Sequence, residues 1–185
     1  MPEGIFGKRN GTMNKFIRGG LLLLVALLAG CTSFQQAMYD LRGLPPGKVS
    51  IVIDLSEQRA DLYAGPELVL TAPVSTGREG HDTLPGRYTV VEKDPDHRSS
   101  VYGAYVADGY VVKRDVDVRK DPRPAGAQFV GAPMPYFLRI YGGVGMHAGY
   151  LPGYPASHGC IRMPAGAARR FYEAARVGTP VTVRR

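Results

Sequence analysis

The most informative stretch of the sequence is residues 147–163, which read His-Ala-Gly-Tyr-Leu-Pro-Gly-Tyr-Pro-Ala-Ser-His-Gly-Cys-Ile-Arg-Met. They contain Cys160, two of the chain's four histidines (His147 and His158) and the hydroxyl of Ser157. A thiol is a good nucleophile only as the thiolate, and an adjacent imidazole can take its proton. Glycines and prolines are spread between these groups, which predicts a shaped loop rather than a helix or strand. The stretch therefore predicts nucleophilic catalysis by Cys160 from a loop that a rigid scaffold holds in place.

These residues resemble a known family. Ser157-His158-Gly159-Cys160-Ile161-Arg162, preceded by His147, is similar to the signature of the L,D-transpeptidase catalytic domain (YkuD type). The loop between His147 and Ser157 is shorter than in many members. Segments 53–58, 73–77 and 83–88 also resemble the family. In the last of these Pro85 is displaced by one position, but a Pro-Gly pair still precedes the next strand.

The resemblance implies a mainly β, β-sandwich-like catalytic domain over residues 48–185 and a peptidoglycan stem peptide as substrate. Cys160 would attack the carbonyl of an L-centred residue, expel a terminal D-amino acid and leave a thioester that an amine resolves. His147 would be the general base, oriented by a backbone carbonyl that is here most simply that of Ala148. Backbone N–H groups around Gly159 and Cys160 would stabilise the oxyanion. With His147 beside it, Cys160 is expected to have a pKa below the free-thiol value of about 8.5. No cofactor and no metal are implied.

Other side chains near the motif have two interpretations each. His158 either polarises or binds substrate, or braces the loop by hydrogen bonds, and we favour the second. Arg162 either grips a substrate carboxylate or forms a salt bridge within the site. Ser157 and Tyr150 are candidate substrate contacts, although both fit a loop-stabilising role better. His97 lies far from the motif in sequence and is an exposed loop histidine by default, but it can also line the substrate groove.

The N-terminus predicts export. Lys15 and Arg18 precede an unbroken apolar run over residues 21–28, and Leu28-Ala29-Gly30-Cys31 matches a bacterial lipobox. The run is far short of the ~20 residues that span a bilayer, which argues against a permanent transmembrane helix. We therefore expect a lipoprotein signal peptide at 1–30, lipid on Cys31 and a tether at 31–47. A plain signal peptide cut elsewhere, or a buried hydrophobic segment, is the alternative.

Charge and cysteine content narrow the function further. Without residues 1–30, 19 Lys and Arg stand against 15 Asp and Glu, so the net charge falls from +7 to +4. This mild basicity suits an anionic polymer such as the cell wall, and no basic stretch is interleaved with aromatics as a nucleic-acid groove requires. If Cys31 carries lipid, Cys160 is left without a disulfide partner. The expected location is the cell envelope, facing the periplasm. Thr32 follows Cys31 where many inner-membrane lipoproteins have Asp, which favours the outer membrane. The oligomeric state is left open.

Strand signals dominate the rest of the chain. Runs rich in β-branched or alternating residues predict strands at 49–54, 59–63, 68–74, 87–92, 103–106 and 137–141. Asp108-Gly109 predicts a tight hairpin, and the charged, Pro-rich residues 113–127 predict an exposed loop. Ala165–Ala175 predicts one helix, stopped by Gly178, before a final strand at 180–183.

Three other functions use the same residues. A cysteine hydrolase on this scaffold would replace the acceptor amine with water. A zinc site made from His147, His158 and Cys160 is chemically possible, but its ligand spacing matches no common structural zinc pattern. A non-catalytic wall-binding lipoprotein would have no need of a free thiol beside His147.

Overall fold

The computed structural model describes residues 48–185. The predicted signal peptide (1–30), Cys31 and the tether (31–47) lie outside the described residues. None of the helices within 48–185 has the length and apolar character needed to span a membrane. The elements in order are β1 (Val49–Asp54), β2 (Arg59–Ala64), β3 (Glu67–Pro73), β4 (Gly86–Thr89), β5 (Glu92–Asp94), β6 (Arg98–Ala107), β7 (Tyr110–Asp117), β8 (Gln128–Pro133), β9 (Phe137–Tyr141), β10 (Val144–Ala148), β11 (Ile161–Met163), α2 (Ala165–Ala174) and β12 (Pro180–Arg184).

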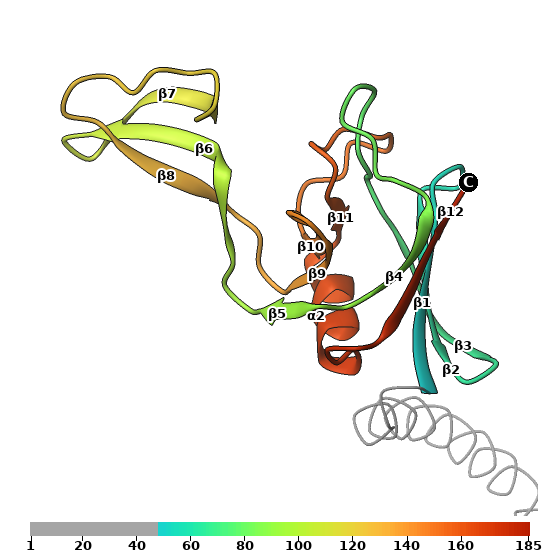
Figure 1. The fold of residues 1–185 in the computed structure, drawn as a ribbon. Helices are drawn as coiled ribbons and strands as arrows, with labels where there is room; N and C mark the ends of the chain where they lie inside the picture. The colour runs from blue at the N-terminus through green and yellow to red at the C-terminus, as the bar shows by residue number, and fades with distance from the viewer. Residues whose placement is uncertain (1–47) are drawn as a thin grey trace, which may run out of the picture. The chain divides into compact units, whose positions relative to one another are not determined.

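A five-stranded sheet in the order β3-β2-β1-β12-β4 forms one side of the domain (Figure 1). Its central strand, β1, pairs antiparallel with β2 and parallel with β12. Alternate residues of β1 and β12 are buried, as expected for strands with one face on a core. Ile51 and Ile53 of β1 lie directly opposite Val181 and Val183 of β12, and all four are buried. The two ends of the catalytic domain are therefore joined in one sheet.

A four-stranded sheet in the order β11-β10-β9-β5 carries the catalytic motif. Strands β10 and β11 run parallel, and α2 contacts β10 and β9. The helix buries Ala168, Phe171 and Ala174, a spacing of three that places them on one face. The prediction of a mainly β domain with one C-terminal helix is confirmed.

A third sheet, in the order β7-β6-β8, is called the arm below. Figure 1 shows it as a sheet of its own, joined to the rest of the domain by the chain entering from β5 and leaving to β9. The predicted hairpin is confirmed, because Asp108 (φ 52°) and Gly109 (φ 79°) join β6 to β7 with the two positive φ angles of a type I′ turn. The arm has a small core of its own, formed by Tyr105, Val116 and Ala127.

Several boundaries differ from the prediction. Residues 113–127 are not one exposed loop, because β7 continues to Asp117 and Val116 is buried in the arm's core. The single strand expected at 87–92 is two strands that pair with different sheets. The catalytic stretch is not entirely loop, since His147 lies on β10 and Ile161–Met163 form β11. The helix ends well before Gly178, and the Lys93 ammonium donates to its free carbonyls at Tyr172 (2.6 Å) and Ala175 (2.5 Å).

Candidate active site

Strand register brings the motif residues to one face of the sheet. In the parallel pair, His147 lies opposite Arg162, and Met146 lies opposite Ile161. Side chains alternate along a strand, so Cys160, two residues before Arg162, shares the face of His147. Neighbouring strands lie about 4.8 Å apart and rise about 3.3 Å per residue, so the Cα atoms of His147 and Cys160 are expected about 8 Å apart. Met146 and Ile161 point to the opposite, buried face. The parallel pairing of β10 with β11 thus brings together two segments that are thirteen residues apart in sequence.

The His147 imidazole is prepared to act as a base. Its Nδ1 lies 2.9 Å from the carbonyl oxygen of Ala148, the partner that the sequence predicted. A carbonyl only accepts, so Nδ1 carries the proton and Nε2 keeps its lone pair. The side chain is buried, and this desolvation lowers the pKa of His147 to about 4. The ring is therefore neutral at pH 7, with Nε2 as a proton acceptor.

Cys160 differs from the prediction in its titration. Burial raises the pKa of its thiol above the ordinary value, and this outweighs the hydrogen bond from the Gly145 N–H and the positive charges of Arg162 and Arg139. The expected depression is therefore wrong for the resting site. Its Sγ lies 3.7 Å from the carbonyl oxygen of Gly143, which suits a protonated thiol as donor. Within residues 48–185 no hydrogen bond joins Cys160 to His147, so the two groups meet as a neutral thiol and a neutral imidazole.

The loop before Cys160 is held by polar contacts that define its shape. Ser157 is buried; its Oγ donates to the carbonyl of Cys160 (2.5 Å) and accepts the N–H of Gly159 (3.0 Å). This confirms Ser157 as a loop-stabilising hydroxyl. The Gly159 N–H is thereby occupied, so it is not available to the oxyanion as predicted. Gly159 is needed for its backbone angle instead, because φ is +113°, where side chains are strained.

Distant segments brace the same loop. The Thr83 hydroxyl is buried and donates to the carbonyl of Gly159 (2.7 Å) while accepting the N–H of Gly77 (2.9 Å). The Thr76 carbonyl accepts the N–H of Ser157 (3.0 Å). The segments 73–77 and 83–88, which resemble the family in sequence, thus act as the loop's scaffold.

His158 contacts three other side chains. The Tyr102 ring of the arm stacks on it, with centroids 4.0 Å apart and planes 23° apart. The His81 ring meets it edge-on at 4.9 Å, and the Arg78 Nη2 lies 2.8 Å from its Nε2. Although His158 is exposed at the surface, this cover lowers its pKa to about 4, and the charge of Arg78 acts in the same direction. These contacts support the bracing interpretation of His158.

Arg162 is a half-buried cation beside the thiol. Burial lowers the pKa of its guanidinium, whereas a negative charge on Cys160, once formed, would oppose that shift. Within residues 48–185 it has no carboxylate partner, so the salt bridge predicted as one alternative is not formed there. Its methylene stem lies against Gly149, where an added Cβ would come within 3.1 Å of it. The charged end is therefore available to an anionic ligand.

Tyr150 and His97, the other two candidate substrate contacts, differ in their surroundings. Tyr150 is 78% exposed, so it does not pack as a cap on the loop. His97 stacks on Phe137 at 4.2 Å and bonds through Nδ1 to Asp94 (3.0 Å). Phe137 in turn lies beside His147, with 6.3 Å between ring centroids. His97 therefore supports the His147 base through the phenyl ring that lies between them.

One group of potential metal ligands occurs in the described part of the chain. It consists of Glu92, Asp94 and His97, whose ligand atoms lie within 4.8 Å of one another. Glu92 already pairs with Arg139 (2.7 Å), and Asp94 pairs with His97. His147, His158 and Cys160 are not gathered in this way, so their geometry does not favour the zinc alternative.

Sequence reasoning missed five residues that shape the site: Arg78, His81, Thr83, Tyr102 and Tyr141. Tyr141 accepts the Leu84 N–H (2.9 Å), and burial raises the pKa of its hydroxyl. All but Tyr141 lie 58 to 82 residues before Cys160, and no local pattern marks them. The one available signal was the resemblance of 73–77 and 83–88 to the family.

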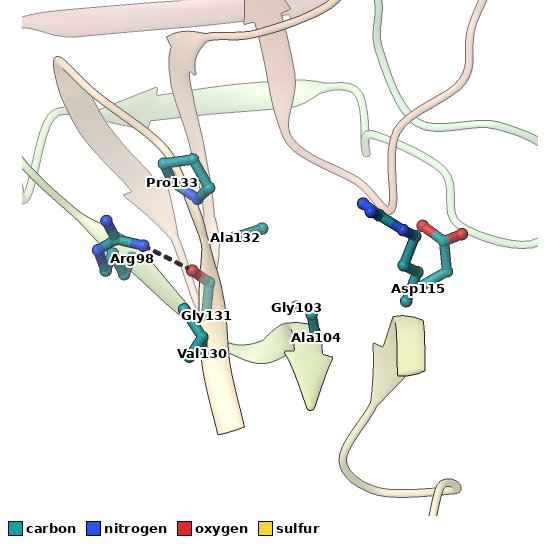
Figure 2. A pocket seen from close by; sticks show the side chains of 9 residues that line it. Arg98, Gly103, Ala104, Asp115, Val130, Gly131, Ala132 and Pro133 are labelled. Atoms are coloured by element: carbon teal, nitrogen blue, oxygen red, sulfur yellow. Dashed lines mark hydrogen bonds between the residues drawn. The ribbon is translucent and has the colours of Figure 1, made fainter. Parts of the chain in front are cut away.

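The arm also carries a hollow of about 280 Å³ (Figure 2). Its lining residues are Arg98, Gly103, Ala104, Arg114, Asp115, Val130, Gly131, Ala132 and Pro133. Figure 2 shows Arg98 donating to the Gly131 carbonyl (3.1 Å) at one end, with Asp115 at the other. Gly103 and Gly131 form the floor of the hollow. A Cβ added to either glycine would lie about 2 Å from the opposing backbone, so the floor has no room for a side chain at these positions. The hollow thus combines a backbone floor with two cations and a carboxylate.

Solved structures of similar fold share this architecture. An L,D-transpeptidase from Mycobacterium smegmatis superposes with a TM-score of 0.56 at 20% identity, covering 75% of this chain and 59% of that one. An L,D-transpeptidase from Stackebrandtia nassauensis gives 0.56 at 19%, covering 75% and 56%. The L,D-transpeptidase LdtMt1 in complex with imipenem gives 0.55 at 19%, covering 74% and 59%. The chain therefore spans less than two thirds of the length of these structures.

Sequence comparison assigns the family. A search of curated proteins finds no match. The family profile of the L,D-transpeptidase catalytic domain (YkuD) matches residues 48–183, which include every residue of the site described above. On that match, and with the fold and the His147–Cys160 face in agreement, the chain belongs to the YkuD family of L,D-transpeptidase catalytic domains.

Proposed function

We propose that this chain is an L,D-transpeptidase that acts on peptidoglycan stem peptides through a thioester on Cys160. The observation that carries the proposal is the neutral His147 imidazole, fixed as the Nδ1–H tautomer by Ala148 on the same sheet face as Cys160. Such a base can take the thiol proton only during attack, because neither group is charged at rest. The proposal thus requires the substrate to be in place before the thiolate forms.

The acylation step follows from this arrangement. His147 Nε2 takes the Cys160 proton while the sulfur bonds to the carbonyl carbon of an L-centred residue. The tetrahedral oxyanion collapses, the C–N bond breaks, and the imidazolium returns the proton to the departing D-amino acid. Because Ser157 occupies the Gly159 N–H, the Cys160 N–H is the candidate donor to the oxyanion.

The second step transfers the acyl group to an amine. The amine attacks the thioester, gives a proton to His147, and forms an amide as the C–S bond breaks; the sulfur recovers the proton. Stem peptides carry carboxylates, and Arg162 offers a half-buried cation beside the thiol that pairs with no carboxylate among residues 48–185. We propose that Arg162 binds such a carboxylate, because a guanidinium recognises it through two parallel hydrogen bonds.

Substitution of Cys160 tests the assignment. Cys160→Ala in the full chain should abolish conversion of a disaccharide tetrapeptide with an acceptor amine present, while the thermal unfolding curve stays unchanged. Turnover retained by the folded variant would refute the nucleophile. Mass spectrometry of the products separates amide transfer from hydrolysis, and muropeptides from cells with and without the allele show whether cross-links depend on Cys160.

We also propose that the chain is exported and anchored in the envelope, facing the periplasm, with outer-membrane location favoured. The support is the sequence Leu28-Ala29-Gly30-Cys31 after a charged start and an apolar run. Radiolabelled palmitate should enter the parent and not Cys31→Ser, and separation of the two membranes should then locate the labelled protein. A mature product that begins elsewhere than Cys31 would refute the anchor.

A further inference from the structure

A contact between the arm and the catalytic loop lies two residues from the nucleophile. The Tyr102 ring on β6 stacks on His158, with 4.0 Å between centroids. Tyr102 is itself held, because Arg119 donates to its hydroxyl (2.7 Å) and pairs with Asp117 (2.7 Å). The contacts at the C-terminal end of β7 thus fix the Tyr102 ring of β6 against the loop.

The rest of the His158 environment makes the stack depend on a neutral imidazole. A guanidinium only donates, so the Arg78 Nη2 at 2.8 Å requires an unprotonated His158 Nε2. The His81 ring contacts His158 edge-on. A proton on Nε2 would break the Arg78 hydrogen bond and place two positive charges in contact.

We propose that Tyr102 is a positioning residue for Cys160, acting through His158. His158 is joined to Cys160 through Gly159, whose strained φ and bond to Ser157 leave the backbone little freedom. Holding the His158 ring in a cage of Tyr102, Arg78 and His81 therefore holds the sulfur at the His147 face. The catalytic consequence rests on the proposed function, whereas the cage itself does not.

The cage has a titration signature. Arg78, His81 and Arg162 oppose protonation of His158, whereas Asp117 favours it, and Arg119 lies between Asp117 and the Tyr102 hydroxyl. Removal of the Tyr102 ring admits water to one face of His158. Its pKa then rises from about 4 toward the free-histidine value of about 6.5.

Three variants of the full chain test the proposal. Tyr102→Leu removes the stack, Tyr102→Phe keeps it and loses only the Arg119 bond, and Tyr110→Leu makes the same change at an exposed position of the arm. NMR titration of the histidine ring protons, with His158 assigned from His158→Gln, should give a pKa near 4 in the parent, Tyr102→Phe and Tyr110→Leu. In Tyr102→Leu it should approach 6.

Turnover should follow the titration. Loss of an aromatic pair predicts a kcat reduced about two- to tenfold in Tyr102→Leu at pH 7.5, with a smaller change in KM. Its pH profile should gain an acid limb near pH 6 that Tyr102→Phe lacks. Tyr102→Met replaces Tyr102→Leu if the latter does not fold.

The possible outcomes distinguish the cage, the positioning role and the proposed function from one another. An unchanged His158 titration in folded Tyr102→Leu overturns the cage. A raised pKa with parental kcat and pH profile overturns the positioning role. If the parent turns over no stem peptide, the proposed function fails, and the titration still decides whether the cage exists.

Discussion

Thr83 gives the sharpest test of how the catalytic loop is held. Its hydroxyl is the one group that ties the Gly77 N–H and the Gly159 carbonyl together, and the side chain is 3% exposed. Thr83→Val keeps the branched shape and removes both hydrogen bonds. It therefore isolates the polar bridge from the packing around it.

The cost can be worked from these contacts. The substitution leaves a buried donor and a buried acceptor without a partner, and each such group costs about 1–3 kcal/mol. Partial relaxation of the loop reduces the sum, so we expect unfolding free energy to fall by about 2–4 kcal/mol. With a urea m-value of about 2 kcal/mol/M, the midpoint should fall by about 1–2 M. Because Gly159 adjoins Cys160, kcat should also fall by about ten- to a hundredfold.

Urea unfolding followed by circular dichroism, together with turnover of the folded variant, measures both effects. Thr182→Val is the matched control, since Thr182 lies on β12 and its hydroxyl has no hydrogen bond within residues 48–185; its stability should change by less than about 0.5 kcal/mol. A Thr83→Val midpoint within the control's range would refute the bridge. Lost stability with parental kcat would show that the loop keeps its geometry without it.

Three further predictions concern the thiol and its base. The pKa of His147 is about 4 in the folded state and about 6.5 in the unfolded state, so the unfolded state binds the proton first as pH falls. The free energy of unfolding should therefore drop by about 3 kcal/mol between pH 6.5 and 4. The drop should be smaller in His147→Gln. The pH midpoint of Cys160 alkylation by iodoacetamide should lie above about 8.5, because burial raises that pKa; a lower midpoint would contradict the neutral resting pair. A carbapenem should add its mass to the peptide containing Cys160 in the parent and in Ser157→Ala, but not in Cys160→Ser; an adduct on Ser157 would show that the nucleophile is misassigned.

The proposed catalytic pair, His147 and Cys160, was predictable because both residues lie in one short stretch of sequence. His147 and Cys160 lie thirteen residues apart, and the pairing of β10 with β11 places His147 opposite Arg162, two residues after Cys160. The orienting carbonyl of Ala148 was predictable for the same reason, since it is the next residue. Local sequence thus determined the chemistry of the site.

The surroundings of the pair were not predictable in the same way. Arg78, His81 and Tyr102 reach His158 from segments about 56 to 80 residues away, where a lone Arg, His or Tyr resembles any surface residue. Residues 113–127 were wrongly predicted as an exposed loop because they are mostly charged and exposed, with only two buried residues, Val116 and Ala127. A small three-residue core gives too weak a periodic pattern to be recognised from sequence.

The error over the Cys160 pKa shows how the site works. A neighbouring imidazole depresses a thiol pKa only when the ion pair is more stable than the neutral pair, and burial of both groups makes the ion pair costly. Here burial acts on each partner separately: it raises the pKa of Cys160 and lowers that of His147, so both shifts favour the neutral pair. In the mechanism proposed above, charge would then develop together with attack, when the new S–C bond and the oxyanion disperse it and the nearby cations Arg162 and Arg139 have an anion to stabilise. A resting thiol of this kind reacts slowly with small electrophiles and oxidants, because they attack the thiolate that the site does not contain. On this proposal, selectivity would follow from the same burial that raises the pKa of Cys160, since only a ligand that fills the site would make proton transfer to His147 favourable.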